Sequence, residues 1–61
     1  MLTEDSAGAL IDELIKRDPA ARDIVAVMRS QRRTNVKIAL CFRRTMLELG
    51  MQDQMADLGM R

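Results

Sequence analysis

The sequence predicts an all-α fold on two observations. Apolar residues recur at helical intervals along most of the chain, and valine, isoleucine and threonine do not alternate with polar residues as they would in a strand. The 61 residues contain no repeat and no Gly/Ser-rich linker, which indicates a single domain over residues 1–61. We expect a helical hairpin with a short first helix, a long second helix and a short helical tail.

The first helix is expected over residues 3–17. Its apolar side chains form one stripe at i, i+3, i+4 and i+7 spacing, made up of Ala7, Leu10, Ile11, Leu14 and Ile15. Thr3 is a favourable N-cap, and the acids that follow it, Glu4 and Asp5, suit the positive end of the helix dipole. This helix should therefore pack through a single apolar face.

The second helix is expected over residues 19–49. Proline disfavours helix in the residue before it and suits the first position of a helix, so Asp18-Pro19 separates the two helices and leaves Asp18 as a cap. Gly50 predicts the end, because glycine readily adopts the left-handed conformation that follows many helices, and an apolar residue after it can pack back. Such a helix would be about 45 Å long.

The stretch RSQRRTNVK, residues 29–37, places basic and polar side chains in the most apolar part of this segment. It contains no glycine or proline to mark a turn, and the apolar residues on either side keep one helical phase, which a loop would have no reason to preserve. We therefore expect one continuous helix. The alternative is a break near residues 30–35, which would give a three-helix bundle.

The apolar stripe of the second helix has a polar centre. Its members follow alternating spacings of four and three residues, as in a coiled-coil seam, and are Ile24, Met28, Gln31, Asn35, Ile38, Phe42, Thr45 and Leu49. Buried Gln31 and Asn35 would pair well in only one alignment of two helices, so this polar seam is a candidate for fixing their register. The alternative is that both side chains are exposed at a thin part of the bundle.

The C-terminal half of the second helix carries a second apolar strip beside the first, formed by Val36, Leu40 and Leu47. The first helix is long enough to cover only the N-terminal half, so either the methionine-rich tail helix over residues 51–58 or another chain must cover the rest. We expect a homodimer. The residues expected at the dimer or partner interface are Ile38, Phe42, Met46, Leu49, Met51 and Met55.

The side chains offer little for catalysis. The sequence has no histidine, tyrosine or tryptophan and no Gly-rich phosphate loop. Cys41 is the single cysteine, so it has no histidine base, no disulfide partner and no second thiol with which to bind zinc. We expect a protein without enzymatic activity, metal or cofactor.

The charge is unevenly distributed, since residues 1–18 hold five acids and two bases, whereas residues 19–49 hold seven bases and two acids. On a continuous helix, five bases would form one basic ribbon that could follow a phosphate backbone. These bases are Arg22, Arg29, Arg33, Lys37 and Arg44. The net charge of only +1 and the lack of interleaved aromatic residues favour an acidic protein partner or a solvated face instead.

The expected class is therefore a regulator that acts by contact. The first ten residues carry acids where a secretion signal carries bases, and the apolar runs are too short to cross a bilayer, so we expect a cytoplasmic protein that does not bind membranes. In general type, the chain is comparable with small bacterial or phage helical-hairpin regulators that occupy a partner's surface, such as an inhibitor or antiactivator of a transcription factor or kinase. The alternative is a small nucleic-acid-binding regulator that uses the basic ribbon.

Overall fold

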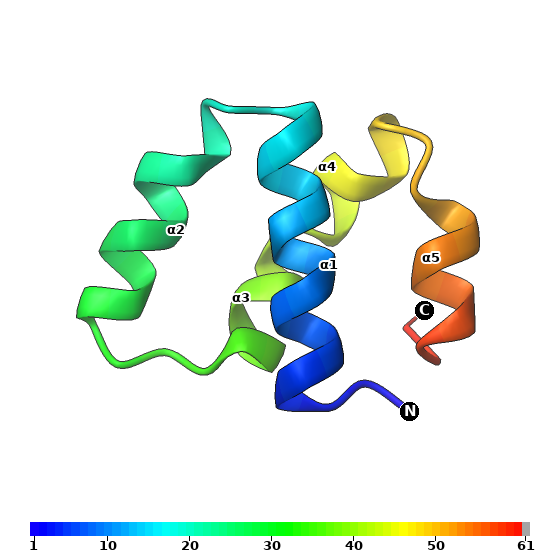
Figure 1. Cartoon of the computed structure of the whole chain (residues 1–61), viewed down its shortest axis with the longest axis horizontal. Helices are drawn as coiled ribbons and strands as arrows, with labels where there is room; N and C mark the ends of the chain where they lie inside the picture. Colours follow the sequence, from blue (N-terminus) through cyan, green and yellow to red (C-terminus); the bar gives the residue numbers. More distant parts are fainter. Residues whose placement is uncertain (61) are drawn as a thin grey trace.

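The computed structural model describes residues 1–60, which form five α-helices and no strand (Figure 1). In chain order, the helices are α1 Glu4–Arg17, α2 Ala21–Ser30, α3 Asn35–Cys41, α4 Arg43–Glu48 and α5 Gln52–Asp57. Figure 1 shows α1 crossing the middle of the molecule, with α2 on one side and α5 on the other. The predicted all-α class is confirmed.

Helix α1 begins with reciprocal capping around Thr3. The Thr3 hydroxyl accepts a hydrogen bond from the backbone N–H of Ser6 at 3.1 Å, and the Ser6 hydroxyl accepts one from the backbone N–H of Thr3 at 2.8 Å. These two bonds satisfy N–H groups for which the first helical turn has no backbone partner. The buried side chains of α1 are Ala7, Leu10, Ile11 and Leu14.

Helix α2 begins at Ala21, two residues later than the predicted start. The backbone N–H of Ala21 donates to the carbonyl of Asp18 at 3.0 Å, and no side-chain hydrogen bond caps the helix. Helix α2 contacts the core through a narrow face, in which Ala21 and Val25 are buried and Met28 is half-buried. Most of its circumference is therefore open to solvent.

The prediction of one continuous helix over residues 19–49 is wrong, because the chain turns between α2 and α3. Arg32 adopts a φ of 63°, in the left-handed region. Its backbone N–H donates to the carbonyl of Arg29 at 3.0 Å, and the N–H of Arg33 donates to the carbonyl of Met28 at 3.1 Å. These bonds form a Schellman motif with arginine at the position where glycine is usual.

Helix α3 has an N-cap of its own directly after this turn. The Thr34 hydroxyl accepts a hydrogen bond from the backbone N–H of Lys37 at 3.2 Å.

One turn residue, Phe42, separates α3 from α4. The N–H of Phe42 donates to the carbonyl of Ile38 at 3.2 Å, and the N–H of Met46 donates to that of Phe42 at 2.9 Å. Because these bonds join residues four apart, side chains on α3 and α4 keep an approximately helical spacing.

Helix α1 packs mainly against α3, so the arrangement differs from the expected hairpin, in which the first helix covers the N-terminal half of a long second one. The end of α4 is the predicted one: Gly50 has a φ of 75°, and the N–H of Met51 donates to the carbonyl of Met46 at 3.0 Å. A second ending of this kind follows α5 at Gly59, with a φ of 70°.

One apolar core joins the five helices. Its buried members are Ala7, Leu10, Ile11, Leu14, Ala21, Val25, Ile38, Ala39, Phe42, Met46, Met51, Met55 and Met60. No polar or charged side chain within residues 1–60 is buried. The methionines of the tail thus complete the same core that α1 and α3 begin.

Candidate protein-interaction surface

Four large apolar side chains are exposed on α2, α3 and α4. Ile24 and Val27 on α2 are 52% and 55% exposed, and Leu40 on α3 and Leu47 on α4 are 51% and 39% exposed. The remaining large apolar side chain exposed among residues 1–60 is Met1. Each of the two pairs is a candidate contact point, because two exposed apolar side chains on the same helical segment form a larger apolar patch than a single exposed side chain does.

The two leucines alternate with two basic side chains. Lys37, Leu40, Arg44 and Leu47 follow one another at spacings of three, four and three residues, which places them on one side of α3 and α4. All four are exposed, whereas Met46 of the same segment is buried. We call these four residues the basic-leucine stripe.

The stripe lies in the basic part of the molecule. Residues 21–44 contain seven basic residues and one acidic residue. Arg44 Nε lies 3.8 Å from Glu48 Oε1, but these side chains are 93% and 72% exposed, so the pair holds Arg44 only weakly. Helices α1 and α5, in contrast, carry six acids and two bases. Basic side chains are therefore concentrated on α2, α3 and α4 and in the turn between α2 and α3, whereas acidic side chains are concentrated on α1 and α5.

The residues predicted as an interface are mostly in the core of the single chain. Ile38, Met46 and Met51 are fully buried, Met55 is 2% exposed, Phe42 is 8% exposed and Leu49 is half-buried. The first helix covers more of them than expected, because α1 packs against α3. The tail adds its methionines to the core, which is the first of the two covers that the sequence left open. They do not form an exposed apolar surface.

The five bases predicted to form one ribbon are divided among several segments. Arg22 and Arg29 lie on α2, Arg33 lies in the turn, Lys37 lies on α3 and Arg44 lies on α4. The turn ends the common helical phase on which the ribbon depended. Within the chain, only pairs that share a helical segment keep their predicted spacing, such as the two on α2.

The predicted polar seam flanks the turn. Gln31 is the exposed C-cap of α2, and Asn35 is the half-buried first residue of α3. Asn35 Nδ2 donates to the carbonyl of Glu4 at 3.4 Å, and Arg29 Nη2 donates to Asn35 Oδ1 at 3.4 Å. A Cβ atom on Gly8 would lie 3.1 Å from Asn35 Nδ2. Asn35 thus helps to join α1, α2 and α3 within one chain.

Glu4 makes a two-armed contact between α1 and α3. Its Oε2 accepts a hydrogen bond from the N–H of Asn35 at 3.0 Å, and its Oε1 accepts one from the N–H of Val36 at 3.0 Å. These hydrogen bonds hold the pKa of Glu4 below its ordinary value of 4.5. The bond from the Val36 N–H has the larger effect, and the bond from the Asn35 N–H the next largest. The first N–H groups of α3 are therefore bound by a carboxylate of the same chain.

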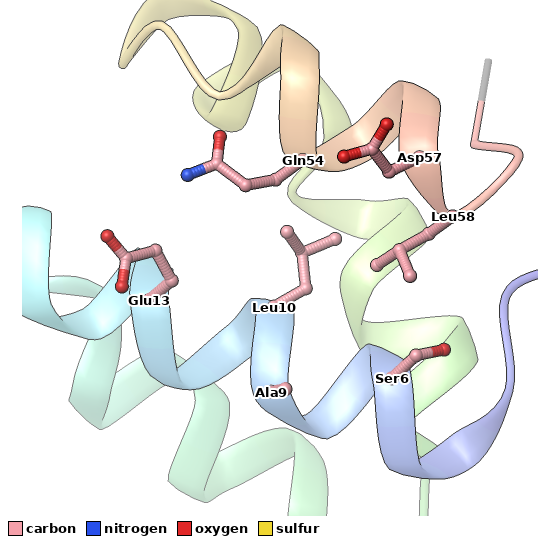
Figure 2. A pocket seen from close by; sticks show the side chains of 7 residues that line it. All are labelled: Ser6, Ala9, Leu10, Glu13, Gln54, Asp57 and Leu58. Atoms are coloured by element: carbon pink, nitrogen blue, oxygen red, sulfur yellow. The ribbon is translucent and has the colours of Figure 1, made fainter.

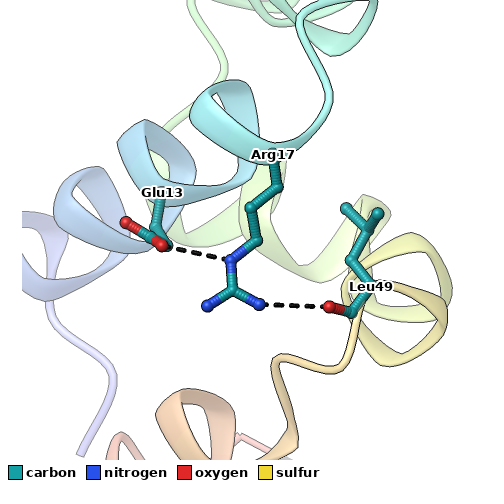
Figure 3. Close-up of polar contacts among 3 residues, drawn as sticks. All are labelled: Glu13, Arg17 and Leu49. Atoms are coloured by element: carbon teal, nitrogen blue, oxygen red, sulfur yellow. Dashed lines mark hydrogen bonds and ion pairs between the residues drawn. The ribbon is translucent and has the colours of Figure 1, made fainter.

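Arg17 joins the C-terminal ends of α1 and α4 (Figure 3). Its Nε donates to Glu13 Oε1 at 3.1 Å, and its Nη1 donates to the carbonyl of Leu49 at 3.1 Å. Leu49 is the C-cap of α4, where carbonyl groups lack helical partners and the helix dipole is negative. The guanidinium satisfies one of these carbonyls and holds α4 beside α1.

A groove of about 400 Å³ lies between α1 and α5 (Figure 2). It is lined by Ser6, Ala9, Leu10, Glu13, Gln54, Asp57 and Leu58. None of these seven residues was a predicted site residue. The groove depends on the packing of α5 beside α1, which follows from the tail methionines and has no local sequence signal.

Sequence reasoning missed the exposed leucines because it placed Leu40 and Leu47 in the buried arc of a continuous helix. The signal that could have found them is their three- and four-residue spacing from Lys37 and Arg44.

Cys41, on the same segment, is free and exposed. Within residues 1–60, no group of three or more cysteine or acidic side chains could hold a metal ion.

Comparison with protein-family models, curated proteins and solved structures finds no match to this chain. Of the helices described here, none combines the length and the apolar character needed to cross a membrane.

Proposed function

We propose that this chain is a small non-enzymatic regulatory protein that binds an acidic partner protein through the basic-leucine stripe. The observation that carries the proposal is the alternation of Leu40 and Leu47, 51% and 39% exposed, with Lys37 and Arg44 on one side of α3 and α4. A partner helix with apolar residues beside acids at matching spacing would cover both leucines and pair with both bases.

A protein partner fits this stripe better than a nucleic acid does. A phosphate backbone pairs with bases but gives little apolar area to cover two exposed leucines. The single aromatic residue, Phe42, is buried and cannot stack on a nucleotide base. The carboxylate of Glu4, bound to the first N–H groups of α3, also occupies the helix end that would otherwise attract a phosphate.

A nucleic-acid-binding regulator is the second candidate, favoured by the seven bases within residues 21–44. It would use Arg22 and Arg29 on α2 with the arginines of the turn. Binding of this kind would be sequence-independent and steeply weakened by salt.

The regulatory role is one of occupying another protein's surface, as an inhibitor or antiactivator of a transcription factor or kinase would. The exposed apolar pairs on α2 and on α3 and α4 support this role. A homodimer would have to use exposed residues such as Leu40 and Leu47, since the predicted dimer residues Ile38, Phe42 and Met46 are buried within one chain.

The proposal is tested by titrating the purified protein against duplex DNA and RNA near physiological salt and by affinity capture from a cell extract with and without nuclease. We expect no nucleic-acid binding tighter than about 1 μM, and we expect capture of an acidic protein that nuclease treatment leaves unchanged. Tighter, salt-dependent nucleic-acid binding, or loss of every captured protein after nuclease treatment, would favour the second candidate.

A further inference from the structure

The groove between α1 and α5 has an apolar floor with polar groups at its edges. Figure 2 shows the Leu10 side chain directed toward α5, where it lies near Leu58. The accessible apolar lining is exposed Ala9 and half-buried Leu58, and Leu10, which is 3% exposed, closes the groove beneath them. The volume of about 400 Å³ lies within the range of small-molecule sites. The floor can therefore cover an aliphatic chain.

The charged side chains that line the groove are both acids. Glu13 comes from α1 and Asp57 comes from α5, and Figure 2 shows their carboxylates on either side of the Leu10 side chain. Glu13 Oε1 is bound by Arg17 Nε at 3.1 Å, whereas Asp57 makes no ion pair with any side chain of residues 1–60. Among residues 1–60, no basic side chain lines the groove. The site should attract a cation and repel an anion.

We infer that this groove binds a small aliphatic cation, a compound that joins an alkyl chain to an ammonium or guanidinium group. The alkyl chain packs on Ala9 and Leu58 above Leu10, and the cationic head lies beside Asp57, which has no ion-pair partner within residues 1–60. The apolar lining favours an alkyl chain, and the acidic side chains favour a cationic head group. An alcohol of the same chain length would lack the charge attraction, and a carboxylate would be repelled. The site is separate from the basic-leucine stripe and does not depend on the function proposed for it.

The test uses three probes of equal chain length and different charge: hexylammonium, hexanol and hexanoate. Methyl NMR spectra of the full chain report binding through the resonances of Leu10 and Leu58. We expect hexylammonium to shift these resonances with an affinity about tenfold higher than that of hexanoate, and with hexanol in between. Equal binding of hexanoate and hexylammonium, or the absence of shifts with hexylammonium, would overturn the inference.

Matched variants separate a defined site from general attraction to an acidic helix. Asp57→Asn and Asp53→Asn remove the same charge from α5, but only Asp57 lines the groove. We expect Asp57→Asn to weaken hexylammonium binding several-fold and Asp53→Asn to leave it unchanged. Ala9→Phe, at an exposed position, should block the groove and abolish the shifts at Leu58. Equal weakening in both asparagine variants would contradict the inference. Tighter binding of a lysine-containing peptide than of hexylammonium would contradict its assignment to a small compound.

Discussion

Glu4 and Arg17 lie at opposite ends of α1, and each binds the backbone at the end of another helix. Glu4 accepts from N–H groups at the start of α3, where the helix dipole is positive, and Arg17 donates to the carbonyl of Leu49 at the end of α4, where it is negative. These contacts span 31 or 32 residues and leave no local signal. The cap at Thr3, whose partner is three residues away, was predictable for that reason.

The contact of Glu4 predicts an acid-sensitive part of the stability. Because the pKa of Glu4 in the folded chain lies below 4.5, the stabilisation is fully present above pH 4.5 and is lost as the pH falls through the folded value. Glu4→Gln should be less stable than the wild type near neutral pH and should lose less stability in acid. Thermal unfolding followed by circular dichroism from about pH 7 to about pH 3 measures both effects.

Asp5→Asn is the matched control, since Asp5 is the adjacent acid on α1 and makes none of the hydrogen bonds to α3. It should keep the acid dependence of the wild type. If Glu4→Gln and Asp5→Asn changed the pH profile equally, the bonds from Asn35 and Val36 to the Glu4 carboxylate would not be its source.

The helix boundaries that the sequence predicted correctly are mostly those with a local signal, such as a capping threonine, a proline or a glycine. Helix α1 starts after Thr3 and ends at Arg17, α4 ends before Gly50, and α5 lies within the predicted tail helix. The turn between α2 and α3 was missed because its left-handed residue is Arg32 instead of glycine. One local signal is present, Thr34, which caps α3, but the prediction was based on the unbroken apolar phase and did not use it.

Arg32→Gly should stabilise the protein. A side chain in the left-handed region strains the backbone, and glycine removes this strain, although its freedom in the unfolded chain offsets part of the gain. We expect the free energy of unfolding to rise by up to about 1 kcal/mol and Tm to rise by about 4–8 °C for each kcal/mol gained. Arg33→Gly removes the same charge at a residue without a positive φ and should not stabilise. A loss of stability in Arg32→Gly, measured by thermal or urea unfolding, would contradict the turn.

The whole molecule separates a basic surface on α2, α3 and α4 from the acidic helices α1 and α5. This polarity was predictable, because it follows from the order of charges along the chain. The position of the apolar contact points was not. A helical phase carried across the turn put Leu40 and Leu47 in the same apolar arc as Phe42 and Met46, whereas the structure exposes the two leucines and buries Phe42 and Met46 within one chain. The groove depends on tertiary packing alone and was not predictable.

The central claim, that the basic-leucine stripe binds a partner protein, is tested most directly by quantitative affinity capture with two matched double variants. Leu40→Gln/Leu47→Gln replaces the exposed leucines of the stripe, and Ile24→Gln/Val27→Gln makes the equivalent change at the exposed pair on α2. Circular dichroism first verifies that both variants are folded. We predict that an acidic protein captured by the wild type is recovered about tenfold less with the stripe variant and undiminished with the α2 variant. Equal recovery with the wild type and the stripe variant would contradict the claim.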